Sequence, residues 1–420
     1  MMKIEEIITI LKSNTEISDY EINHETKHSS ELFFVKKKME LNRVVHTEDI
    51  TITVYKDVVD KRGSSSIVVT SADDKTSLEN KITSALKKAT TALNPWFSLT
   101  KNQSINKTID TNISLNDIAL SVGDTIMQVN NEHGWLNATE IFVYITEHEF
   151  LNSNDVKDVE TKLSVEFETI PTCSDGKEEY ELYQYYRNNQ FDAESIKKQV
   201  EDILYLVSLR GQAKKMNEVD IDLNVPVYIY GDMNALILKN IKDNTSYLSN
   251  VTHSNHYNLN EPISNTKFDI VMKGNIEGVA ASSSFDEHGV VLNEVKLIED
   301  GVVKQLQGDI QYGQYLKVEE PTGDYTVAEV IPHTTIETNE PHLIIDHFSA
   351  PQLEQASGYF GGEVRLARYF DGEKYIPLTG FSISGDIYDA MNDIAFSKEE
   401  TVYTYYKGPK YFIFKNLTIS

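Results

Sequence analysis

The C-terminal half of the chain is dominated by short β-type segments, and this pattern constrains the fold more than any other feature. Helical periodicity is sparse in this half and is confined to residues 233–241 and 386–394. Short apolar runs bounded by turn residues are typical of strands. We therefore expect residues 223–420 to form a mainly-β domain with its own core. The predicted strands are 225–230, 268–273, 289–298, 302–307, 342–348, 362–370, 376–384 and 411–418.

Two units that mix helical and strand patterns precede this domain. Residues 1–96 begin with apolar residues at helical spacing, continue with strand patterns that indicate a small antiparallel sheet, and end in a helix before Asn94-Pro95. The residue before a proline avoids helical angles, so the helix should stop there. In residues 112–211, a helix capped by Ser114 is followed by strand patterns and by a long helix that ends at Gly211.

Two polar segments separate the three units. Residues 98–112 and 212–222 contain few apolar side chains and are predicted to be linkers. The predicted domains are therefore 1–96, 112–211 and 223–420. The predicted fold class is α+β, with N-terminal and middle α/β units built of small sheets and packed helices, and a mainly-β C-terminal domain.

Charge and cysteine content exclude several classes of protein. The 420 residues include 39 basic and 65 acidic side chains, a net charge of −26, which opposes binding to DNA phosphates or anionic membranes. The only cysteine, Cys173, excludes internal disulfides and four-cysteine zinc sites. Glu5 and Glu6 occupy positions where a signal peptide would need apolar residues. No apolar run is long enough to span a membrane. We expect a cytoplasmic protein that binds neither nucleic acid nor membranes.

One short motif resembles a zinc-peptidase signature but lies in the wrong kind of element. His24-Glu25-Thr26-Lys27-His28 matches the pattern H-E-x-x-H, which requires a helix so that both imidazoles reach one metal ion. The surrounding residues have a strand pattern. On a strand, positions four apart are about 13 Å from each other, too far to share a metal. We therefore expect no zinc site at His24 and His28.

The third domain contains an ordered series of motifs that points to a known family. Residues 282–289 read Ser-Ser-Ser-Phe-Asp-Glu-His-Gly, and residues 295–304 form a hairpin pattern with an Asp-Gly turn. Glu-Pro-Thr-Gly follows at 320–323, then Ala-Ser-Gly-Tyr-Phe at 356–360 and Gly-Phe-Ser-Ile-Ser-Gly-Asp-Ile at 380–387. In order and spacing this series resembles the C-terminal domain of the TldD/PmbA family, also called modulator of DNA gyrase or TldD/TldE peptidases. The resemblance extends to the N-terminal sheet and helix.

The resemblance further implies which type of family member this is. TldD-like chains carry a His-Glu-x-x-x-His zinc motif on a helix early in the third domain, together with a late cysteine. Residues 224–252, where that helix should lie, contain no histidine, and no cysteine follows Cys173. The sequence therefore resembles the TldE/PmbA type, which lacks the zinc motif. No metal or cofactor is expected in this chain, and zinc is expected in a TldD-like partner.

By resemblance, the chain would help to form a groove for extended peptides, used in peptide maturation or in the degradation of unfolded peptides. Its partner would be a TldD-like zinc peptidase subunit or a second copy of itself. Backbone amides along such a groove bind an extended chain by strand addition. No catalytic residue is predicted. The positions that match the family and are candidates for the groove are Phe285, Asp286, Gly289, Ser357, Phe360, Ser384 and Gly385.

Other interpretations of these residues stay open. The seven groove candidates could instead be turn and packing residues. The chain could be a self-sufficient metallopeptidase that uses unusual ligands such as His253, His256, Asp286 or His288. It could also be a stand-alone peptide-binding homodimer. The net charge argues against direct binding to DNA, despite the family's historical name.

Overall fold

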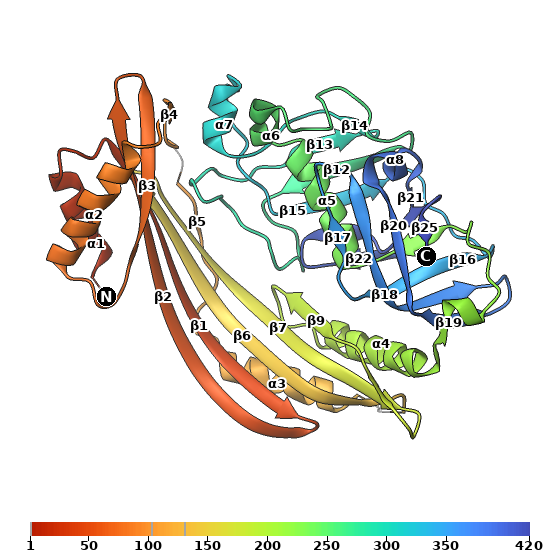
Figure 1. Ribbon diagram of the computed structural model, residues 1–420. Coiled ribbons are helices and arrows are strands. Elements are labelled where there is room, and N and C mark those ends of the chain that lie inside the picture. Colours follow the sequence, from red (N-terminus) through yellow and green to blue (C-terminus); the bar gives the residue numbers. More distant parts are fainter. Residues whose placement is uncertain (1, 102–103, 130–131) are drawn as a thin grey trace.

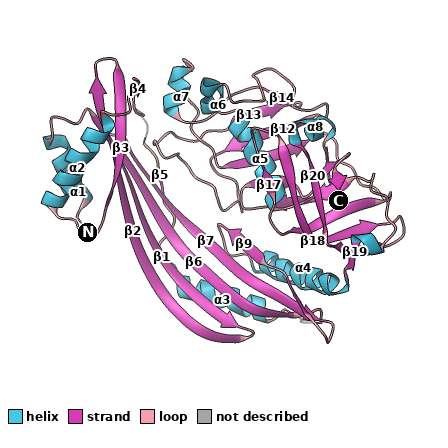
Figure 2. Ribbon diagram, in the orientation of Figure 1, coloured by secondary structure: helices cyan, strands magenta, loops and turns pink. Residues whose placement is uncertain are grey.

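The computed structural model describes residues 2–101, 104–129 and 132–420. Within these residues the chain forms a long curved sheet, with helices at both of its ends, and a β-rich C-terminal domain beside it (Figure 1). Strands predominate in both parts (Figure 2). The predicted α+β class with a β-rich C-terminal domain is confirmed.

The curved sheet has nine strands in the described residues and joins the first two predicted units. Its strand order is β4-β3-β2-β1-β6-β7-β5, and β8 and β9 also pair with β7. β1 pairs along its length with β2 on one side and with β6 on the other. The domain limits 1–96 and 112–211 stay predictions, but their strands belong to one sheet. The strands are β1 (Asp19–Val35), β2 (Lys38–Val58), β3 (Lys61–Val69), β4 (Asn94–Pro95), β5 (Asn106–Lys107), β6 (Trp135–Asn152), β7 (Lys157–Ser174), β8 (Glu179–Glu181) and β9 (Gln184–Asn188).

One face of this sheet carries two apolar cores. At one end, α1 (Ile4–Ser13) and α2 (Lys75–Ala89) pack on a core that includes Ile22 of β1. At the other end, α3 (Leu115–Met127) and α4 (Ala193–Gln212) pack on a core that includes Leu32 of the same strand. Ile22 and Leu32 are an even number of residues apart, so both point to the same face.

The opposite face is polar and meets the C-terminal domain. Because side chains alternate along a strand, Glu21 on β1 and Glu160 on β7 point away from the helices. Glu160 accepts hydrogen bonds from the backbone N–H and the hydroxyl of Ser284, at 3.1 and 2.6 Å. Glu21 contacts the imidazole of His288 at 3.1 Å. Buried carboxylates of the sheet thus hold the two parts of the molecule together.

The C-terminal domain encloses one core between a ten-stranded and a six-stranded sheet. The first sheet has the order β10-β19-β18-β16-β11-β24-β21, with β17, β20 and β25 attached, and the second has the order β14-β13-β12-β15-β23-β22. The elements are β10 (Lys214–Lys215), β11 (Val227–Ile229), α5 (Asp232–Asn244), α6 (Tyr247–Thr252), β12 (Phe268–Lys273), β13 (Val295–Glu299), β14 (Val302–Val303), α7 (Ile310–Tyr315), β15 (Val327–Pro332), β16 (His342–Phe348), β17 (Gln352–Leu353), β18 (Tyr359–Phe370), β19 (Tyr375–Thr379), β20 (Phe381–Asp386), α8 (Ile387–Ala390), β21 (Ala395–Phe396), β22 (Glu400–Val402), β23 (Tyr406–Pro409), β24 (Phe412–Phe414) and β25 (Thr418–Ile419).

The observed strands differ from the predicted ones mainly where the chain turns. The predicted segments 268–273 and 342–348 coincide with β12 and β16. The segment 376–384 divides at Gly380, which has a φ of 73°, into β19 and β20. Both strands pair antiparallel with β18, so the glycine interrupts the pairing without reversing the chain. The segment 289–298 starts as a strand only at Val295, because the residues before it form a loop against the curved sheet.

The segment 98–112, predicted to be a linker, is held by both parts of the molecule. The backbone N–H of Ser98 donates to Gln314 in the C-terminal domain at 2.9 Å, and the hydroxyl of Thr100 donates to the carbonyl of His288 at 2.7 Å. The N–H of Ile105 donates to Asp158 of β7 at 2.6 Å. In the described ranges, none of the helices has the length and apolarity needed to cross a bilayer.

Candidate functional site

A cleft of about 780 Å³ lies between the polar face of the curved sheet and the C-terminal domain. Its volume is within the range typical of ligand sites. The curved-sheet side is formed by residues of β7, β9 and the first turns of α4, and the C-terminal side by the start of α5, the end of β16 and residues 402–407. Two hydrogen bonds span the two sides: the imidazole of His347 contacts the carbonyl of Tyr183 at 2.8 Å, and the N–H of Gly278 donates to Asn189 at 3.2 Å.

Pairs of tyrosine and carboxylate side chains line both walls of the cleft. On the C-terminal wall, the hydroxyl of Tyr403 donates to Asp232 at 2.5 Å. On the sheet wall, burial raises the pKa of Tyr183 to about 12, with further contributions from its hydrogen bond to Glu168 and from the charge of Asp232. Asp232 therefore lies close enough to act on a side chain of the opposite wall. Both phenols stay protonated and donate to the carboxylates at neutral pH.

Most acidic side chains of the cleft have no basic partner. In the described part of the chain, Glu168, Asp192, Asp232 and Glu277 form no ion pair with a lysine, arginine or histidine. Asp192 instead caps α4, accepting from the N–H of Ser195 at 3.0 Å. The arrangement concentrates negative charge in a concave, partly apolar site.

The basic side chains of the cleft are fewer. Arg187 is bound to Glu166 at 2.6 Å, and Asp346 is matched by two hydrogen bonds of 2.7 Å from Arg368. Lys407 lines the cleft and forms no ion pair within the described residues. The cleft thus has more carboxylates than cations.

Three of the seven groove candidates lie in the loop that faces the curved sheet. Phe285 is buried against Phe150, and its ring lies 4.9 Å from that of His148. The carboxylate of Asp286 accepts from the N–H groups of residues 288, 290 and 324 at 2.9 to 3.0 Å, and burial raises its pKa to about 6 despite these bonds. Gly289 has a φ of 70°, and a Cβ there would lie 2.3 Å from the ring of Phe150.

The other four candidates lie on the paired strands β18 and β20 and on the turn before β18. Ser357 is exposed and donates to Glu354 at 3.0 Å, whereas Phe360 is fully buried in the core. Gly385 pairs with Phe360, and Ser384 pairs with Gly361. None of the seven candidates lines the cleft. Their role in a groove stays a prediction, and the contacts of Phe285, Gly289 and Phe360 are those of packing residues.

The helix α5 has buried asparagines where zinc ligands were considered in the sequence. Asn234, Asn240 and Asn244 are each at most 3% exposed. Asn234 donates to the hydroxyl of Tyr406 at 3.2 Å, and Asn244 accepts from the N–H of His256 at 2.8 Å. A neutral amide is a poor zinc ligand compared with imidazole, thiolate or carboxylate. Asn234 and Asn244 of this helix therefore form hydrogen bonds in the interior of the domain.

The histidines proposed as unusual ligands do not form a metal-binding group in the described residues. His288 contacts Glu21 at 3.1 Å and Asp309 at 3.3 Å. Burial would lower the pKa of His288, but the hydrogen bonds to these two carboxylates outweigh it and raise the pKa to about 11. His256 stacks on Tyr388 with ring centres 4.1 Å apart. These histidines thus have structural partners.

His24 and His28 lie on a strand, as the sequence predicted. The two nitrogens of His24 contact Glu48 of β2 at 3.1 Å and Glu149 of β6 at 3.4 Å. The hydrogen bond to Glu149 is the main reason that the pKa of His24 is raised. The H-E-x-x-H pattern here is therefore part of a cross-strand network.

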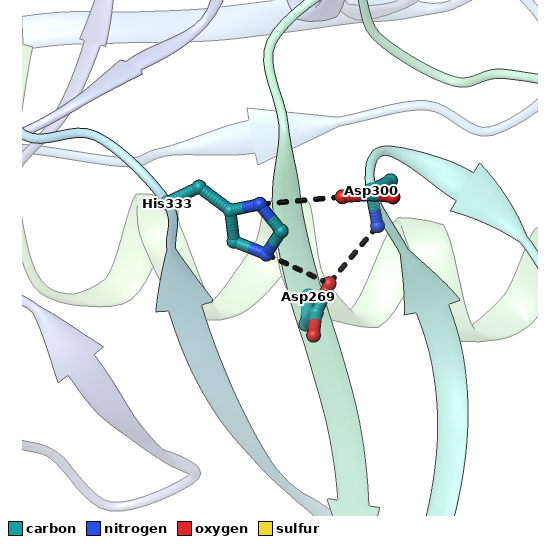
Figure 3. Close-up of side chains that lie close together, drawn as sticks. All are labelled: Asp269, Asp300 and His333. Atoms are coloured by element: carbon teal, nitrogen blue, oxygen red, sulfur yellow. Dashed lines mark hydrogen bonds and ion pairs between the residues drawn. The ribbon is translucent and has the colours of Figure 1, made fainter.

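One group of potential metal ligands occurs within the described ranges, on β12 and at the ends of its neighbours β13 and β15 in the six-stranded sheet (Figure 3). The two nitrogens of His333 contact Asp269 and Asp300, each at 3.2 Å. The N–H of Asp300 donates to Asp269 at 2.9 Å, and Lys296 lies 3.8 Å from Asp269. Both imidazole nitrogens are therefore already used, and the Lys296 cation also lies beside Asp269. The group is explained as an ion-pair network that fixes the β13–β14 hairpin.

The sequence did not identify the residues of the cleft. The tyrosine-rich segment around Tyr183 and the acidic Asp232 at the start of α5 were visible, but they belong to separate segments of the chain. Carboxylates are so common in this sequence that none of them stands out. Only the packing of the two parts brings Tyr183, Glu168, Asp232 and Tyr403 to one site.

The fold, a curved sheet whose polar face meets a two-sheet β domain, is similar to that of solved structures with low sequence identity. The structure of TldE from Thermococcus kodakarensis is similar over 99% of both chains, with a TM-score of 0.81 and 16% identity. A candidate modulator of a DNA gyrase from Thermotoga maritima has a TM-score of 0.78 at 14% identity, again over 99% of both chains. A second candidate modulator of DNA gyrase, from Bacteroides thetaiotaomicron, has a TM-score of 0.76 at 12% identity over both full chains.

Residues 233–420 match the family described as PmbA/TldA metallopeptidase C-terminal domain. This match confirms the resemblance of residues 233–420 to the C-terminal domain of the TldD/PmbA family, as the sequence motifs predicted. No curated protein matches the sequence.

Proposed function

We propose that this chain is a non-catalytic, TldE-like subunit that contributes a peptide-binding groove to a TldD/TldE-type metallopeptidase. The observation that carries the proposal is α5. This helix opens the domain that matches the family, and its buried polar residues are asparagines instead of histidine and glutamate. The chain would bind peptides, and a TldD-like partner would supply zinc and hydrolyse them.

The cleft supports the peptide-binding part of the proposal. It lies between two sheets, has a polar floor from the curved sheet, and carries both phenol and carboxylate groups. Such mixed surfaces suit extended peptides, whose backbone needs hydrogen-bond partners and whose side chains need pockets. Maturation of a precursor peptide and removal of unfolded peptides are the processes that this arrangement would serve.

The test is reconstitution with a TldD-like chain that carries His-Glu-x-x-x-His. We expect the isolated chain to contain no zinc by mass spectrometry and to leave a fluorescent unfolded peptide intact. The two chains together should form a complex in size-exclusion chromatography and hydrolyse the peptide faster than the TldD-like chain alone. The matched control is a TldD-like chain with its motif glutamate replaced by glutamine, which should form the complex without activity.

Two results would overturn the proposal. Hydrolysis by the isolated chain with about one zinc per chain would show a self-sufficient metallopeptidase. A stable homodimer that binds peptides and does not associate with the TldD-like chain would show a stand-alone binding protein.

A further inference from the structure

We infer that the cleft between the curved sheet and the C-terminal domain selects peptides by a basic side chain, lysine or arginine. The inference rests on the proposed function, because it assumes that an extended peptide enters this cleft. It adds the chemistry by which the peptide would be recognised. The residues that carry it are Glu168 and Tyr183 on the sheet wall and Asp232 and Tyr403 on the opposite wall.

The first argument is unmatched charge on facing walls. Glu168 comes from β7 and Asp232 from the first turn of α5, and neither has a basic partner among the residues that the structure describes. Glu277 adds a third unmatched carboxylate at the exposed rim of the cleft. Carboxylates that converge in a concave site strengthen the local field and favour a cation between them.

Three other carboxylates of this region have basic partners. Asp346, which also lines the cleft, is paired with Arg368, and Glu166 beside it is paired with Arg187. Glu160, on the same face of the sheet, has Lys162 at 3.4 Å. Glu168, which is partly buried, and Asp232, which is exposed, have no such partner in the described residues, and an incoming guanidinium or ammonium group would supply one.

The second argument is the aromatic lining. Tyr183, Tyr230 and Tyr403 contribute flat phenol rings beside the carboxylates. Long basic side chains place their methylene stems on such surfaces, and their cations favour the ring faces. The molecule already uses this contact once at the same place, because the Nζ of Lys410 lies 5.8 Å from the ring centre of Tyr230.

Lys407 is the group that opposes a basic ligand. It lines the cleft from β23 without an ion pair in the described part of the chain. It faces four carboxylates that have no basic partner, Glu168, Asp192, Asp232 and Glu277. The net charge of the side chains that line the cleft therefore stays negative. Lys407 would contact a backbone carbonyl or the carboxylate of the same peptide.

The experiment measures binding of fluorescent, unstructured ten-residue peptides by anisotropy, with the whole chain in complex with its TldD-like partner. The partner carries glutamine at its motif glutamate so that the peptides stay intact. Three peptides differ only at one central position, which is arginine, glutamine or glutamate. We expect the arginine peptide to bind tightest and its advantage to shrink with added salt.

Variants of the chain test the effect of the two carboxylate charges separately from that of the tyrosines. Glu168→Gln combined with Asp232→Asn keeps an oxygen that can accept from Tyr183 and Tyr403 but removes both charges. We expect it to bind the arginine peptide about tenfold more weakly and the glutamine peptide unchanged. Glu373→Gln, an exposed carboxylate in the turn between β18 and β19, is the matched control and should change nothing. If the double variant does not fold, Glu277→Gln at the exposed rim should weaken the arginine peptide about threefold.

The outcomes separate this inference from the proposed function. Equal binding of the three peptides, or an unchanged arginine preference in the double variant, overturns the inference and leaves the peptide-binding role standing. Absence of binding for every peptide overturns the peptide-binding role itself. Preference for the glutamate peptide would show that Lys407 dominates and would also overturn the inference.

Discussion

The curved sheet carries two separate apolar cores on one face, whereas the C-terminal domain encloses a single core between two sheets. In the sheet, β1 contributes Ile22 to one core and Leu32 to the other. In the C-terminal domain, residues of both sheets and of α5 meet in the same core. A single apolar face requires only every second residue of a strand, and the remaining residues are free to be polar.

This difference explains where the candidate site lies. The polar face of the curved sheet supplies Glu168 and Tyr183, while the C-terminal domain supplies Asp232 and Tyr403 at its surface. The C-terminal domain contributes to the cleft through residues that lie outside its enclosed core. The open face of the curved sheet makes a charged cleft possible.

The largest expected effect concerns the enclosed core. Phe414 is fully buried there, so Phe414→Ala should lower the free energy of unfolding by about 3–5 kcal/mol, because it leaves a cavity between sheets that cannot collapse. Urea denaturation measures the loss. The control Tyr405→Ala, at an exposed side chain, should change it by less than about 0.5 kcal/mol. A loss below about 1 kcal/mol at Phe414 would contradict a single tightly packed core.

A smaller effect tests whether the two cores of the curved sheet are independent. Ile82 on α2 is fully buried in the first core, so Ile82→Ala should cost about 2–4 kcal/mol. Since β1 serves both cores, hydrogen exchange should also quicken at residues 141–145 and 163–167 of the second core. Lys87→Ala, exposed on the same helix, is the control. Unchanged protection at these residues would mean that 1–96 and 112–211 unfold as separate domains.

The smallest effect concerns the contact between the two parts. His288→Gln removes the ion pairs with Glu21 and Asp309 and should cost about 1–3 kcal/mol at pH 7. The raised pKa of His288, about 11, means that its stabilisation is complete below about pH 6.5 and is lost as the pH rises towards 11.

The measurement is urea denaturation between pH 6 and 10. The free energy of unfolding should fall with rising pH in the native chain, by at most about 1.4 kcal/mol per pH unit from this group, and the fall should be shallower in His288→Gln. Parallel pH profiles for the two proteins would show that this histidine does not hold the two parts together.

Part of the fold was predictable because it depends on local patterns. The pattern of apolar residues predicted the observed bounds of β12 and β16. The strand pattern around His24 argued against the zinc site that the motif alone suggested. The order of turn motifs from residue 282 to residue 387 pointed to the family whose C-terminal domain residues 233–420 match. The lack of histidine in α5 was equally visible in the sequence.

The sequence by itself indicated many of the elements, the apolar faces and the resemblance of residues 233–420 to the C-terminal domain of the family. Only the tertiary structure decided that β1, β2 and β6 share one sheet and that Glu168 and Asp232 face the same cleft. The physical reason is that strand pairing and docking of surfaces join residues that are distant in the sequence, through backbone hydrogen bonds that carry no side-chain signature. A carboxylate in an acidic sequence becomes distinctive only when its neighbours in space are known.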